Sequence, residues 1–162
     1  MSDCSAHRVP RAGLDPIDGP ATALAVVRLA VHVPHVHETV VLLLDHDRCG
    51  LGITVVGGTC RPDDVLEVTE CLLTAAAGTD RVGAIVVASV RPDDSASAAC
   101  HPDGCKRGSD DVDDWIPAHW DPDRWVEMNE LADTAGIELV EWFVISDHVT
   151  TPRDHFGEPP RW

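Results

Sequence analysis

Long apolar runs are absent from this 162-residue chain, and none approaches the ~20 residues that a membrane-spanning helix needs. Basic residues are also scarce: 12 Lys and Arg stand against 28 Asp and Glu, and the formal net charge is −16 at pH 7. A surface of this charge repels phosphate backbones and anionic lipid. The composition therefore predicts no direct nucleic-acid partner and no membrane partner.

Paired cysteines are missing as well. The six cysteines stand singly, with no Cys-x-x-Cys motif, so a disulfide framework is not indicated. The first 21 residues contain charged residues and prolines but no apolar core of the kind that secretory signals have. We therefore expect reduced thiols and a cytoplasmic location.

The length suits one compact domain with a core of its own. Residues 1–21 are polar and punctuated by proline and glycine, a composition that does not order itself, so we expect them to form a flexible N-terminal arm. The domain then covers residues 22–162. No glycine-rich phosphate loop follows any of its expected strands.

Periodicity within the domain predicts a mixed α/β fold. Two amphipathic helices are expected, over residues 63–77 and 124–134, packed on different faces of a sheet. The continuous apolar run at residues 82–88 predicts a central strand, and a turn at residues 47–50 predicts an antiparallel hairpin. The remaining apolar runs predict strands over residues 23–33, 38–45, 51–57 and 137–145.

Residues 93–120 show no periodicity and are rich in aspartate. Loops of this length are uncommon inside compact domains and often carry function. We interpret the segment as a long acidic inserted loop, and a solvated insertion and a binding loop both remain open.

Several segments resemble the RadC-like branch of the JAB/MPN metalloprotease family over about residues 38–145. Glu38 opens a strand, Gly57, Gly58 and Thr59 end the next, and the segment from Gly83 to Pro92 follows a helix. The resemblance implies a single three-layer, cytidine deaminase-like α/β domain in which helices flank a mixed sheet. In active members a strand Glu is the base, and His-x-His-Pro and Ser-x-x-Asp segments hold zinc.

Carried onto this chain, the resemblance places Glu38 at the base and Asp121 at the metal-binding Asp. Ser89 and Arg91 stand where the two histidines would be, and Ala118 stands where the serine would be. A hydroxyl and a guanidinium are not zinc ligands of this kind. The resemblance therefore implies an inactive domain with no cofactor and vestigial site positions Glu38, Ser89, Arg91 and Asp121.

Such a domain would act as a binding or scaffolding module, with a protein partner or a second copy of itself. We expect the permanent charge of Arg91 to fill the vacated cation position and to pair with Glu38, Asp121 or both. The other interpretation, that Arg91 points into the acidic loop, stays open.

A zinc-dependent metallohydrolase of peptidase or isopeptidase type is the alternative function. A rebuilt zinc site would then draw on side chains of the inserted loop and its end, namely His101, Cys105, His119 and Asp121. A second histidine cluster, formed by His32, His35 and His37, has a spacing that metal sites can use, but we expect surface or half-buried histidines there.

Overall fold

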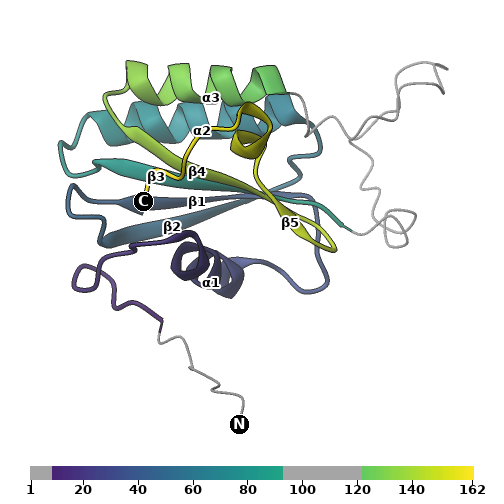
Figure 1. Cartoon of the computed structure of the whole chain (residues 1–162), viewed down its shortest axis with the longest axis horizontal. Coiled ribbons are helices and arrows are strands. Elements are labelled where there is room, and N and C mark those ends of the chain that lie inside the picture. Colours follow the sequence, from purple (N-terminus) through teal and green to yellow (C-terminus); the bar gives the residue numbers. More distant parts are fainter. Residues whose placement is uncertain (1–8, 93–121) are drawn as a thin grey trace, which may run out of the picture.

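The computed structural model describes residues 9–92 and 122–162, which form a mixed α/β fold: a five-stranded mixed sheet with three α-helices (Figure 1). The predicted α/β fold class is thereby confirmed at this level. Residues 93–120, the predicted inserted loop, lie outside the described residues. The elements in chain order are α1 (Pro20–Ala30), β1 (Glu38–Leu44), β2 (Gly50–Gly57), α2 (Pro62–Ala77), β3 (Ala84–Val90), α3 (Pro122–Thr134), β4 (Glu138–Ile145), β5 (Val149–Thr150) and the short 3-10 helix η2 (Pro152–Phe156).

The strands lie in the order β2-β1-β3-β4-β5. β1 runs antiparallel to both β2 and β3, β3 and β4 are parallel, and β5 returns antiparallel to β4. Every residue of β3 is buried, as is typical of a strand covered on both faces, and Ser89 is its one polar residue. The predicted central strand, the hairpin and the two predicted helices are confirmed.

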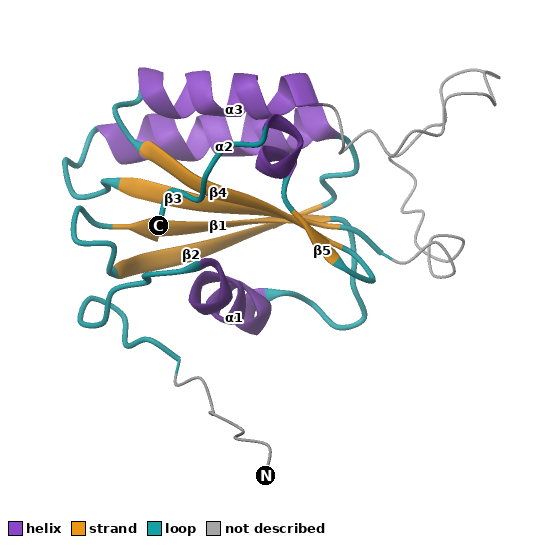
Figure 2. Ribbon diagram, in the orientation of Figure 1, coloured by secondary structure: helices purple, strands orange, loops and turns teal. Residues whose placement is uncertain are grey.

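Helices cover both faces of the sheet. In Figure 2, α2 and α3 lie together on one face and α1 lies on the other. The prediction that α2 and α3 pack on different faces is therefore wrong. The prediction of a strand over residues 23–33 is also wrong, because this run forms α1. Pro20 starts that helix, and Ala23 and Val27, one turn apart, are both fully buried.

Residues 9–21 pack against the sheet rather than extending as an arm. Ile17 is only 2% exposed, and its main-chain N–H donates to Arg48 O at 3.0 Å. Gly13 N–H donates to Gly50 O, also at 3.0 Å. The prediction of a flexible arm over residues 1–21 is therefore wrong for residues 9–21, and residues 1–8 lie outside the described part. The burial of Ile17 and these main-chain hydrogen bonds together hold the segment against the sheet.

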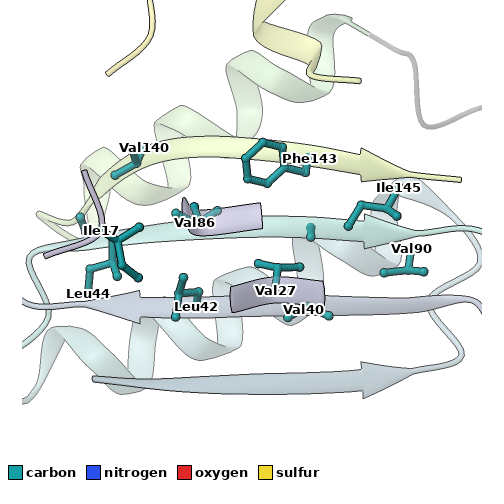
Figure 3. Close-up of a cluster of buried hydrophobic side chains, with 13 residues drawn as sticks. Ile17, Val27, Val40, Leu42, Leu44, Val86, Val90, Val140, Phe143 and Ile145 are labelled. Atoms are coloured by element: carbon teal, nitrogen blue, oxygen red, sulfur yellow. The ribbon is translucent and has the colours of Figure 1, made fainter. Parts of the chain in front are cut away.

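Two apolar clusters form the core, one on each face of the sheet. Figure 3 shows the α1-side cluster, in which Ile17 and Val27 meet alternate residues of the central strands, such as Val40, Leu42 and Val86. The other cluster contains the intervening residues Val41, Ile85 and Val87 with Trp125, Met128 and Trp142. Among the helices of the described residues, none is long and apolar enough to cross a membrane.

Candidate functional site

One edge of the sheet gathers the carboxyl ends of β2, β3 and β4, together with the N-termini of α2 and α3 (Figure 1). The pairing fixes this arrangement, because Glu38 at the start of β1 lies between Gly57 and Val90, and Val90 lies beside Ile145. In open α/β sheets, ligands bind outside the carboxyl ends of the strands. We call residues 57–61 and 89–92 the carboxyl edge and take it as the candidate site.

Arg91 is the buried cation of this edge. Its side chain follows β3, the residue is 5% exposed, and Nη1 donates to Thr59 O at 2.5 Å and to Val90 O at 3.3 Å. Within the described residues, Nε and Nη2 have no hydrogen-bond partner. Burial lowers the pKa of Arg91, and the nearby Cys60 and Asp64 oppose that shift. One edge of the guanidinium is thus fixed by main-chain carbonyls, and the other edge is buried without a hydrogen-bond partner among the described residues.

Ser89 lies on the same face of β3 as Arg91, two residues away. It is fully buried, and its Oγ accepts a hydrogen bond from Trp142 Nε1 at 2.8 Å. Thr39 is the direct partner of Ser89 on β1, and its Oγ1 donates to Thr59 Oγ1 at 2.8 Å. The hydroxyls of Ser89, Thr39 and Thr59 are therefore already hydrogen-bonded within the protein.

Glu38 faces the other side of the sheet. Its register partner is Val90, whose side chain belongs to the α1-side cluster, so Arg91 one residue later points to the opposite face. Glu38 is fully buried and accepts hydrogen bonds from His32 N at 2.9 Å and His32 Nδ1 at 2.6 Å. The predicted pairing of Arg91 with Glu38 is therefore wrong. The predicted pairing with Asp121 lies outside the described residues.

The described residues do not fit the zinc ion that the JAB/MPN resemblance brings with it. The Ser89 hydroxyl already accepts a hydrogen bond from Trp142, and Arg91 carries a positive charge that repels a cation. Glu38 points to the opposite face of the sheet. Within residues 9–92 and 122–162 no group of three or more His, Cys, Asp and Glu could hold a metal ion. The other proposed ligands, His101, Cys105, His119 and Asp121, lie outside these residues, as does Ala118.

The histidine cluster before β1 lies at the surface, as predicted. His32 is exposed and bound to Glu38, and His35 and His37 are half-buried. The three side chains do not form a metal-binding group within the described structure.

The start of α2 completes the carboxyl edge. Arg61 N donates to Asp64 Oδ2 at 2.8 Å, and Arg124 from α3 pairs with Asp63 at 2.7 Å. Burial raises the pKa of Asp64, but the hydrogen bonds from the main chain and side chain of Arg61 outweigh it, so the pKa lies below its usual value. These two carboxylates are therefore bound by arginines other than Arg91.

The sequence interpretation missed Thr59, Cys60 and Asp64 as neighbours of Arg91. The available signal was the glycine pair that ends β2 just before them, which places the next residues at the same edge as the end of β3. No family model matches the chain, and no curated protein is significantly similar to it.

Proposed function

We propose that this chain is a non-catalytic binding module, the role implied by its resemblance to RadC-like JAB/MPN domains, and that its ligand lies against the carboxyl edge. The observation that carries the proposal is the buried guanidinium of Arg91, whose Nε and Nη2 lack partners among the described residues. An unsatisfied buried donor costs ~1–3 kcal/mol, and more when it is charged. A ligand that supplies the acceptor is therefore bound favourably there.

The chemistry of the edge favours binding over hydrolysis. A guanidinium stays protonated in proteins, so Arg91 cannot serve as a general base or a metal ligand. Ser89 Oγ accepts a hydrogen bond from a buried indole and lies fully buried. The three-layer arrangement of helices on both faces of a mixed sheet supports the family proposal at the level of the fold.

The test uses the full chain, labelled with ¹⁵N and screened by NMR against a library of small polar compounds. We expect hits to move the amide resonances of Gly58, Thr59 and Arg91, and to be recovered chemically unchanged. Elemental analysis should find no stoichiometric zinc, and neither a quenched peptide library nor isopeptide-linked diubiquitin should be cleaved. Hits that move only distant amides would contradict the proposal.

The alternative function, a zinc-dependent metallohydrolase with a rebuilt site, gives a different result in the same test. It requires one zinc per chain together with cleavage of one of these substrates. Loss of both in His101→Ala or Cys105→Ala would establish it in place of the binding module.

A further inference from the structure

We infer that the group bound at the carboxyl edge is the carboxylate of a small organic acid, held by both Nε and Nη2 of Arg91. This inference rests on the proposed function and adds the chemical class of the ligand. The observation behind it is that Nη1 of Arg91 donates to main-chain carbonyls, whereas Nε and Nη2 have no partner among the described residues.

The guanidinium has five N–H donors in a rigid plane. Nη1 is used by Thr59 O and Val90 O, which fix the rotation of the plane. The unpartnered atoms, Nε and Nη2, are neighbours along one edge of that plane. Their N–H bonds run parallel and match the two oxygens of a carboxylate in a bidentate pair. The two nitrogens that such a pair needs therefore have no partner among the described residues.

Charge selects a monoanion over a phosphate. Asp64 lies close enough to Arg91 to influence its pKa, and Asp63 is next to it on α2. Arg61 and Arg124 pair with these two carboxylates, so Arg91 alone balances the charge of a ligand, and the second charge of a phosphate would add to a chain of net charge −16. A carboxylate gains the bidentate contact without that repulsion.

Burial selects a small ligand. Nε and Nη2 are both buried, and Thr59 beside them is 4% exposed. A small acid reaches such atoms with little rearrangement of the strand ends, which a polymer would have to open widely. Once the carboxylate is inside, low solvent access strengthens its attraction to the guanidinium.

The experiment follows the Nε–H resonances of arginine side chains in the ¹⁵N-labelled full chain. Sodium acetate is titrated against sodium chloride at equal ionic strength. We expect a saturable shift of the Arg91 Nε–H resonance with acetate and none with chloride. Arg153 is the internal control, because its Nε already donates to Glu141 at 3.1 and 3.3 Å, and its resonance should stay in place. An unmoved Arg91 resonance would overturn the inference.

A parallel titration with inorganic phosphate separates the two anion classes. We expect a shift at least about tenfold weaker in apparent affinity than with acetate, and equal or tighter binding of phosphate would overturn the choice of carboxylate. Arg91→Lys keeps the charge but loses the planar fork, so acetate affinity should fall about tenfold. Unchanged affinity in this variant would refute bidentate binding, and the wild-type titration stands even if the variant does not fold.

These outcomes also separate the inference from the proposed function. If an uncharged compound moves the amides of the carboxyl edge while acetate does not move Arg91 Nε–H, the binding module stands and the carboxylate assignment fails. If acetate and the library hits all bind elsewhere on the chain, both fail.

Discussion

Arg153 lies against the carboxylate of Glu141, whereas the hydrogen bonds of Arg91 go to main-chain carbonyls. Both arginines are buried, and Glu141 is fully buried. Burial raises the pKa of Glu141, and the contact with Arg153 opposes that shift. Removing either partner of such a pair leaves a buried charge without its counterion. The Arg153 pair therefore links η2 to β4, whereas Nε and Nη2 of Arg91 have no hydrogen-bond partner among the described residues.

Asp64 provides a test at the level of one residue. It caps α2 by accepting the N–H of Arg61 at 2.8 Å, and it interacts with the Arg61 side chain at 3.0 Å. Asp64→Ala should lower the free energy of unfolding by about 1 kcal/mol at pH 7, the usual value of a lost cap. Urea denaturation measures the change.

The effect of Asp64 should depend on pH with a defined sign. Its pKa is lower in the folded chain than in the unfolded chain, so its stabilisation is present above the unfolded pKa and is lost as pH falls through the folded pKa. The difference between parent and Asp64→Ala should therefore shrink in acid. Glu67→Ala, at an exposed position on the same helix, is the control and should change stability by less than about 0.5 kcal/mol at either pH. A difference that grows in acid would contradict the assignment.

At the scale of elements, the sequence predicted most helices and strands correctly. Two predictions were wrong: a strand over residues 23–33, and the placement of α2 and α3 on different faces of the sheet (Figure 2). The run at residues 23–33 is apolar enough to suit a buried strand or a buried helix, and periodicity alone does not separate them. Pro20 at the start and the four alanines of α1 were the signals that favoured a helix.

The common face of α2 and α3 follows from the strand order, which the sequence did not provide. β2 and β3 are both antiparallel to β1, so they are parallel to each other, and β4 is parallel to β3. The connections through α2 and α3 both step in the same direction along the sheet. Right-handed crossovers in one direction place both helices on one face.

Gly83 tests how closely the elements approach at the opposite edge of the sheet. A Cβ there would lie 2.7 Å from His46 Nδ1 and 2.9 Å from His46 Cα, next to the bond from Gly83 N to Leu44 O. Gly83→Ala should therefore lower the free energy of unfolding by about 1–3 kcal/mol, the range for overpacking. Gly52→Ala is the matched control, because a Cβ at Gly52 would meet nothing within 4 Å. Equal urea midpoints for the two variants would show that His46 moves aside freely.

At the scale of the whole molecule, the central sheet separates two groups that the sequence placed in one site. Glu38 belongs to the α1 side, where His32 binds it, and Arg91 belongs to the side of α2. The resemblance to RadC-like JAB/MPN domains predicted that both lie near the same end of the sheet, and the register of β1 against β3 agrees with this. The face on which each points depends on the register of β1 against β3, which a single sequence does not reveal.

This separation predicts the result of rebuilding a zinc site. Ser89→His/Arg91→His restores two imidazoles, but Glu38 remains on the far face and cannot join them as a ligand, so Glu38→Gln should leave the zinc content of the double variant unchanged after dialysis. Adding Thr39→Glu places a carboxylate directly opposite residue 89 and on its face, and this triple variant should gain zinc. Elemental analysis of dialysed protein, with circular dichroism as the check on folding, measures both. If the double variant alone binds one zinc per chain and Glu38→Gln releases it, Glu38 reaches the imidazoles and the separation of the two faces is refuted.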